Sequence, residues 1–80
     1  MAGAHQPAVR YRVIGDMVRF SVVTDAEFRF TLIDASGQVL YTMHGCGPST
    51  MDVPKRALRS GVHFVRVISA SGSVEKTMVR

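Results

Sequence analysis

A histidine and a cysteine stand two residues apart in a glycine-rich segment, where His44 is followed by Gly45, Cys46 and Gly47. A catalytic Cys–His pair needs the imidazole within hydrogen-bond reach of the sulfur and a third group to orient the ring. Side chains two apart on a strand point the same way, and Asp52 is a candidate for the orienting carboxylate. An 80-residue chain leaves little room for an enclosing pocket, so we predict that the protein is not an enzyme.

The remaining candidates for metal or phosphate chemistry are incomplete. A structural zinc site needs about four ligands at paired spacing, and one cysteine with the scattered His5, His44 and His63 does not supply them. The glycines at 45 and 47 are not followed by Lys-Ser/Thr and a long helix, as a phosphate-binding loop requires. We therefore expect no metal and no cofactor. The single cysteine excludes an intrachain disulfide.

The charge is basic but dispersed. Ten Lys and Arg against six Asp and Glu give a formal net charge of +4. We expect Arg19, Arg29 and Arg66 on solvent faces of strands; if those strands are neighbours, the three form a cationic stripe that would dock an acidic partner, extended by Arg12. The simpler interpretation is a solvated face. Basic blocks with interleaved aromatics are absent from the sequence, so we predict no nucleic-acid partner.

These residues must be positioned by short strands. Turn signals recur every 8–12 residues, and between them apolar and polar residues alternate with a period of two. About seven such runs predict an all-β fold, an immunoglobulin-like β-sandwich of short antiparallel strands in Greek-key order. An open oligonucleotide-binding barrel is the main alternative. The expected core is Val18, Phe20, Val22, Phe28, Phe30, Leu32, Tyr41, Leu58, Val65, Val67 and Met78.

One domain fits the length, with residues 1–8 as a flexible lead-in and residues 9–80 as the sandwich. Residues 54–61 predict a short helical crossover, with Pro54 at its first position and Gly61 after its end. No apolar run approaches the ~20 residues of a membrane helix, so we expect no stable membrane insertion. Residues 1–7 lack the apolar core of a signal peptide.

Three segments of the second half together resemble a known family. Residues 30–40 (FTLIDASGQVL) resemble the strand–D-x-x-G–strand unit of type IX secretion C-terminal sorting domains. Residues 58–67 (LRSGVHFVRV) resemble its L-x-x-G strand, although His63 stands where the family usually has Tyr. Residues 74–80 (VEKTMVR) resemble its terminal strand. The resemblance covers roughly residues 16–80.

The resemblance implies a sorting signal and not an enzyme. Such a domain follows a cargo protein that reaches the periplasm on its own signal peptide. It is then recognised by the outer-membrane translocon and is commonly removed by a surface endopeptidase. The implied partners are therefore the translocon, the endopeptidase and an N-terminal cargo domain, and the implied location is the periplasm in transit, then the cell surface. We expect removal in or before residues 1–8.

The resemblance also implies which residues the translocon recognises: Gly37, Gly61, Lys76 and Arg80. Simpler roles exist for these positions, because both glycines suit turns and Lys76 suits protection of a sheet edge. Two other functions stay open. One is a non-catalytic accessory module that binds carbohydrate or protein, for which exposed aromatics would argue. The other is a small nucleic-acid-binding barrel, suggested only by the charge of +4.

Overall fold

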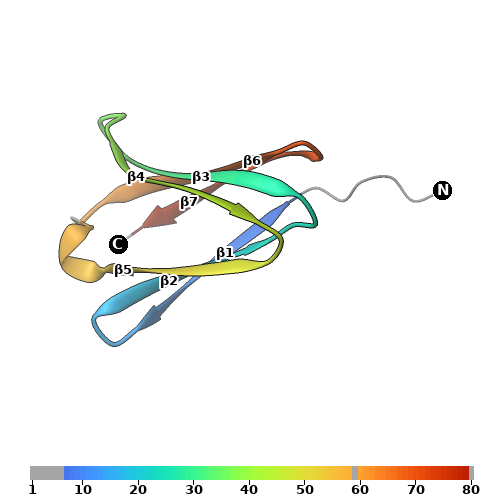
Figure 1. The fold of residues 1–80 in the computed structure, drawn as a ribbon. Helices are drawn as coiled ribbons and strands as arrows, with labels where there is room; N and C mark the ends of the chain where they lie inside the picture. Colours follow the sequence, from blue (N-terminus) through green and yellow to red (C-terminus); the bar gives the residue numbers. More distant parts are fainter. Residues whose placement is uncertain (1–6, 59, 80) are drawn as a thin grey trace.

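The computed structural model describes residues 7–58 and 60–79, which form two antiparallel sheets packed face to face (Figure 1). The three-stranded sheet has the order β1-β2-β5, from β1 (Ala8–Ile14), β2 (Met17–Val23) and β5 (Ser49–Pro54). The four-stranded sheet has the order β4-β3-β6-β7, from β4 (Val39–Cys46), β3 (Glu27–Asp34), β6 (Val62–Ser69) and β7 (Gly72–Val79). The predicted sandwich of seven antiparallel strands is confirmed.

Three connections are hairpins within one sheet, and three cross between the sheets. Hairpins join β1 to β2, β3 to β4 and β6 to β7, whereas the connections β2–β3, β4–β5 and β5–β6 pass from one sheet to the other. Strand pairing does not join the two sheets in the described part of the chain, as a closed barrel would require. The immunoglobulin-like Greek-key order stays a prediction. The first strand begins at Ala8, one residue before the predicted start of the domain.

Alternation along the strands builds the core, because every second side chain of each strand faces the other sheet. At its centre the Phe20 and Phe30 rings meet with centroids 5.3 Å apart and planes inclined at 57°. Sequence reasoning missed Val9 and Val53, which are also buried. The buried apolar set is Val9, Val18, Phe20, Val22, Phe28, Phe30, Leu32, Val53, Leu58, Val65, Val67 and Met78.

The prediction that Tyr41 belongs to the core is wrong, because this side chain is 42% exposed. Its register is inward, opposite Leu32. However, β4 is an edge strand, and the β3–β4 hairpin rises away from the three-stranded sheet at this point (Figure 1). The opposing sheet therefore does not cover Tyr41.

The predicted helical crossover is a single 3₁₀ turn, η1 (Lys55–Ala57). Pro54 precedes the turn in an extended conformation instead of occupying its first position. The Lys55 backbone N–H donates to the Asp16 carbonyl at 2.8 Å, and the Leu58 N–H donates to the Lys55 carbonyl at 2.9 Å. The turn thus ties β5 to the β1–β2 hairpin and delivers Leu58 into the core.

Candidate functional site

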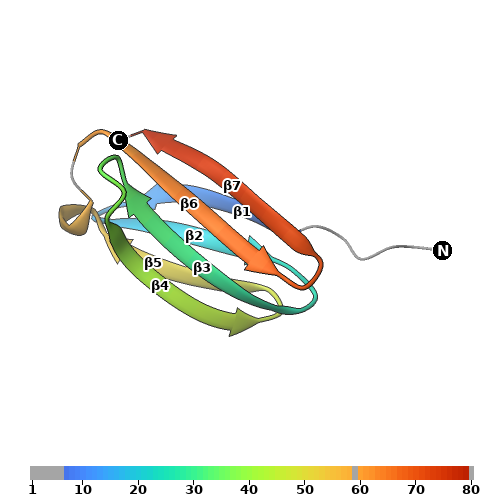
Figure 2. The ribbon, with the colours of Figure 1, turned by 90° about the horizontal axis from the view of Figure 1, so that it is seen from above.

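Most of the features with functional potential gather at one end of the sandwich, which we call the η1 end (Figures 1 and 2). It comprises the β1–β2 turn, the β3–β4 turn, η1, the entry to β6 and the end of β7. The strand register fixes this grouping, since His63 pairs with Asp34 and Val62 pairs with Val79. Segments far apart in the sequence therefore share one surface.

Asp34 organises the β3–β4 turn. One of its carboxylate oxygens accepts hydrogen bonds from the Ser36 hydroxyl (2.6 Å), the Ser36 N–H (2.9 Å) and the Gln38 N–H (2.9 Å). Gly37 donates its N–H to the Asp34 carbonyl at 3.0 Å and has a φ of +91°, which favours glycine. The expectation that Gly37 suits a turn is confirmed.

The hydrogen bonds at Asp34 predict how acid affects the turn. The Ser36 hydroxyl and the Gln38 and Ser36 backbone amides hold the pKa of Asp34 below its usual value near 4. A lowered carboxyl pKa stabilises the fold above the unfolded-state pKa, and this contribution disappears as the pH falls through the folded-state pKa. We expect Asp34→Asn to lower the urea midpoint at neutral pH, and the difference from wild type to shrink as pH falls below about 4. Asp25→Asn, at an exposed carboxylate of the β2–β3 turn, is the control; a pH-independent deficit in Asp34→Asn would contradict the prediction.

Gly61 and the β3–β4 turn that contains Gly37 lie beside one hollow. Gly61 has a φ of +118°, as predicted for the entry to its strand. A hollow of about 200 Å³ is lined by residues 34–36 of the β3–β4 turn and residues 60–63 at the entry to β6. A neighbouring hollow of about 400 Å³ adds Arg56 and Leu40 to the walls formed by Asp34 and His63. The structure thus brings the Gly37 turn and Gly61 to one surface.

His63 borders both hollows but is itself buried. Its side chain is 2% exposed, and its Nδ1 has no hydrogen-bond partner within the described residues. The inward register of His63, shared with Val65, places the imidazole in the layer between the sheets.

The η1 end also exposes apolar side chains. Contiguous exposed apolar surface on a small domain often marks a binding site. Among the large exposed hydrophobic residues of the described chain, only Val23 and Ile68 belong to the other end. The exposed members at the η1 end are Val13, Ile14, Val39, Tyr41, Val62 and Val79.

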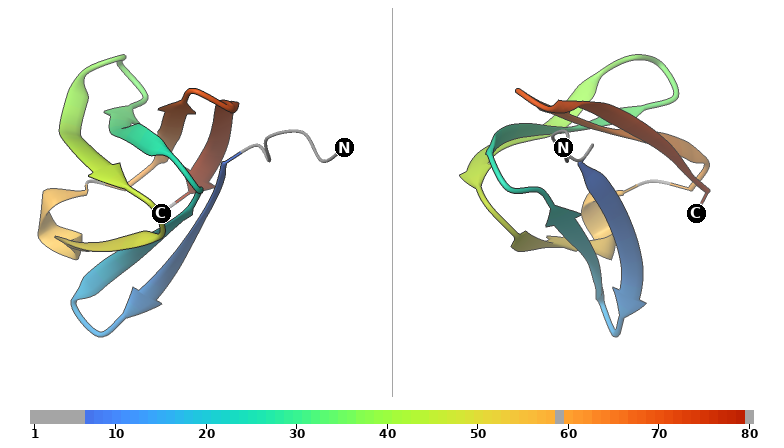
Figure 3. Two further views of the ribbon diagram at one scale, coloured as in Figure 1. Left: turned by 45° about the vertical axis from the view of Figure 1, so that its right-hand side comes forward. Right: turned by 90° about the vertical axis from the view of Figure 1, so that its right-hand side faces the viewer.

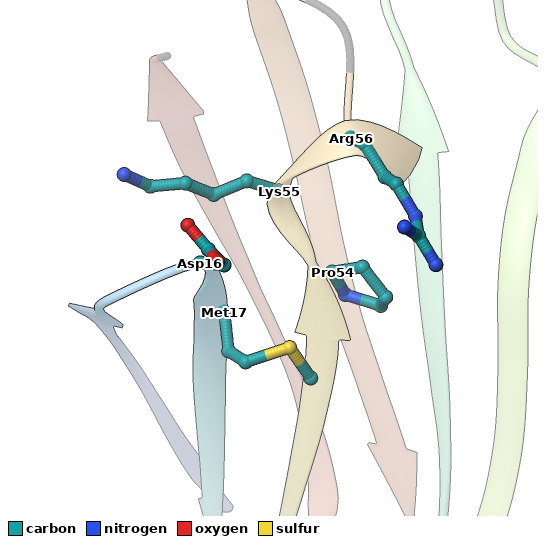
Figure 4. Close-up of a pocket in the computed structure, with 5 residues that line it drawn as sticks. All are labelled: Asp16, Met17, Pro54, Lys55 and Arg56. Atoms are coloured by element: carbon teal, nitrogen blue, oxygen red, sulfur yellow. The ribbon is translucent and has the colours of Figure 1, made fainter.

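A wider hollow of about 500 Å³ lies between η1 and the β1–β2 turn (Figure 4). Met17 and Pro54 form its apolar part. Figure 4 shows the Lys55 side chain extending on the same side as Asp16, whereas Arg56 turns to the other side of η1. Asp16, Lys55 and Arg56 thus place charges of both signs around this apolar part.

Lys76 lies near the middle of β7, the edge strand that pairs only with β6 among the described strands. The predicted edge position is confirmed. Its Nζ lies 5.7 Å from the centre of the Tyr11 ring, so a cation–π contact bridges β7 and β1 along one side of the sandwich (Figure 2). An inward charge of this kind also discourages unwanted strand addition. Arg80, His5 and residues 1–6 of the predicted lead-in lie outside the described residues.

The predicted cationic stripe is wrong. Arg29 and Arg66 belong to adjacent strands of the four-stranded sheet, but Arg19 lies on β2 in the other sheet. Arg19 also binds Asp52 through two hydrogen bonds of 2.8 and 3.1 Å, and Arg66 binds Glu75 at 2.9 Å. The hydrogen bond from Arg19 and the charge of Arg19 lower the pKa of Asp52. The hydrogen bond to Asp52 and the charge of Asp52 raise the pKa of Arg19.

The considered Cys–His–Asp group is not assembled. His44 and Cys46 are exposed on β4, opposite Arg29 and Glu27 respectively, whereas Asp52 is held by Arg19 in the other sheet. Across residues 7–58 and 60–79, no three His, Cys, Asp or Glu side chains are grouped so that they could hold a metal ion. The described chain also contains no helix of the length and hydrophobicity needed to cross a membrane.

Comparison with known proteins supports the fold alone. No family model and no curated protein matches the chain. The structure is similar to the crystal structure of a hypothetical protein from Pyrococcus horikoshii OT3, with a TM-score of 0.58 and 13% sequence identity. That similarity covers 95% of this chain and 88% of the other.

Proposed function

We propose that this domain is a C-terminal sorting domain that directs a cargo protein through the type IX outer-membrane translocon. The observation that supports the proposal most is the placement of the three resembling segments. Residues 30–40, 58–67 and 74–80 are separate in the sequence, yet their described parts contribute to the β3–β4 hairpin, β6 and β7 of one sheet. Their turns meet at the η1 end.

In this proposal the translocon binds the η1 end and recognises the shape of its surface. Gly37 and Gly61 set the two turns, and exposed apolar side chains such as Val62 and Val79 provide contact area. Lys76 and Arg80 keep the recognition roles that the resemblance implies. The domain performs no catalysis and needs no cofactor. The cargo precedes β1, and the surface endopeptidase cuts in or before residues 1–8.

The proposal includes the immunoglobulin-like Greek-key order. The strand orders β1-β2-β5 and β4-β3-β6-β7, with three connections that cross between sheets, support this assignment. Such a fold keeps its hairpin turns at the two ends of the sandwich, where a partner can reach them. The proposed route places the domain in the periplasm during transit and then at the cell surface.

A transplant tests the sorting function. Residues 1–80 are fused behind a periplasm-directed fluorescent reporter in a bacterium with the type IX machinery and in a translocon-deficient strain. We expect reporter outside the cells only where the translocon is intact. A folded fusion that stays in the periplasm of both strains would refute the proposal.

A second candidate function is the non-catalytic accessory module. The exposed ring of Tyr41 favours it, because exposed aromatic side chains commonly contact sugar rings in carbohydrate-binding modules. Glycan-array binding that Tyr41→Ala abolishes would support this function. Without a glycan partner, Tyr41 is simply part of the apolar η1 end.

A further inference from the structure

The outer face of the three-stranded sheet carries a cluster of arginines, which we call the arginine face: Arg10, Arg12 and Arg19. Arg12 lies directly opposite Arg19 on the neighbouring strand. Like charges in this cross-strand position disfavour each other. The strands of this sheet carry one acidic residue, Asp52, and Arg19 already holds it. The face therefore has surplus positive charge.

Arg10 and Arg12 also belong to a free sheet edge. Within the described chain, β1 pairs with β2 on one side only, and it forms the margin of its sheet in the right-hand view of Figure 3. An edge strand presents N–H and C=O groups that another extended chain can pair with. The arginines are two residues apart, so their side chains leave the same face about 7 Å apart along the strand.

The inward side of the same strand is incompletely covered. Val13 pairs with the buried Val18 but is itself 54% exposed, and Tyr11 is only partly buried. The β1–β2 hairpin extends away from the four-stranded sheet at this end (Figure 1). A strand added along β1 would therefore meet arginines on its outer face. On the inner face it would meet apolar side chains and, at Tyr11, the Lys76 ammonium that lies over the ring.

We propose that β1 accepts an extended acidic segment of another protein as a fourth strand of its sheet. The segment would alternate acidic with apolar residues, because the period of two on β1 requires carboxylates at every second position. Those carboxylates would pair with Arg10 and Arg12 in the fork geometry that guanidinium groups favour. The intervening apolar side chains would cover Val13 and the edge of Tyr11.

Two other occupants fit less well. A second copy paired through β1 would bring the two arginine-bearing edges together, which cross-strand repulsion opposes. A single-stranded nucleic acid favours aromatic platforms, and the aromatic side chains of this sheet, Tyr11 and Phe20, share the inward register with the core. This inference rests on the edge of β1 and on Arg10 and Arg12, which the sorting function does not use, although Val13 belongs to both surfaces.

The test measures binding of a nine-residue peptide that alternates glutamate with valine to the 80-residue chain. Isothermal titration gives the affinity, and amide hydrogen exchange shows where the peptide pairs. We expect saturable binding and slower exchange at the β1 amides that do not bond to β2. The same peptide with lysine in place of glutamate should bind at least about tenfold more weakly.

Charge-matched variants separate pairing on β1 from general attraction. Arg10→Gln with Arg12→Gln and the single change Arg29→Glu each lower the formal net charge from +4 to +2. The double variant should lose about tenfold in affinity, whereas Arg29→Glu, on the other sheet, should stay within about twofold of wild type. Equal losses in the two variants would overturn the proposal.

Three further results would also overturn it. They are equal binding of both peptides, absence of binding by the glutamate peptide, and binding without protection at β1. A dimer in sedimentation whose contact protects the β1 amides would assign the edge to a second copy. DNA that displaces the peptide more strongly than negative charge alone accounts for would assign the edge to a nucleic acid. Because the peptide comparison uses the unmodified protein, it decides the question even if a variant fails to fold.

Discussion

Replacing Phe30 by alanine should destabilise the domain by about 3–5 kcal/mol, the usual cost of removing a fully buried aromatic ring. Phe30 is fully buried and packs against Phe20 with ring centroids 5.3 Å apart. A domain of this length has roughly 4–12 kcal/mol of stability, so Phe30→Ala should leave little or no folded population in mild urea.

Tyr41→Ala is the matched aromatic control. Tyr41 faces the same way in the register but is 42% exposed, so its removal should cost less than about 1 kcal/mol. Urea unfolding followed by circular dichroism measures both variants. Equal losses of unfolding free energy would mean that the two sheets enclose Tyr41 as they enclose Phe30, and the open η1 end would then be incorrect.

Gly45→Ala should destabilise the domain by about 1–3 kcal/mol through overpacking. A β-carbon at Gly45 would lie 2.6 Å from the Phe28 ring, and this ring is buried, so moving it would disturb its packing in the core. The φ of Gly45 is not in the left-handed region, so the expected cost is steric and not conformational. Thermal unfolding measures the loss.

A second substitution tests that cause. Phe28→Leu shortens the obstructing side chain, so Gly45→Ala should cost less in the Phe28→Leu background than in wild type. A double-mutant cycle measures this coupling between Gly45 and Phe28. Additive losses of unfolding free energy would show that the clash with Phe28 is not what excludes alanine at position 45.

Sequence reasoning predicted the features that depend on local pattern. Alternation of apolar and polar residues identified the strands, and Asp34 with Gly37 identified a hairpin turn whose hydrogen bonds are all local. The cationic stripe failed because Arg19 and Arg29 stand on consecutive strands that enter different sheets. Which strands become neighbours depends on the whole topology, and alternation along one strand contains no information about it.

In the candidate site, too, the local features were predictable from the sequence and the grouping of distant segments was not. Gly37 and Gly61 were each predictable as turn residues. The hollow that Gly61 shares with residues 34–36 of the β3–β4 turn follows from the pairing of Asp34 with His63 across β3 and β6. The exposure of Val13 and Tyr41 depends on how far each hairpin extends beyond the opposing sheet. Alternation along a strand gives no information about that extension. The alternation of Arg10 and Arg12 that builds the arginine face could be seen in the sequence. That β1 is an edge strand among the described strands, on which the proposed binding depends, follows only from the topology.

The most direct test of the central claim, that the η1 end carries the export signal, compares two tryptophan variants in the reporter transplant. Ala35→Trp obstructs the hollow between the β3–β4 turn and the entry to β6, whereas Ala70→Trp places the same bulk on the exposed β6–β7 turn at the other end. The measured quantity is the fraction of reporter outside the cells. We predict that Ala35→Trp keeps the folded reporter in the periplasm while Ala70→Trp exports like wild type; equal export by both variants would contradict the claim.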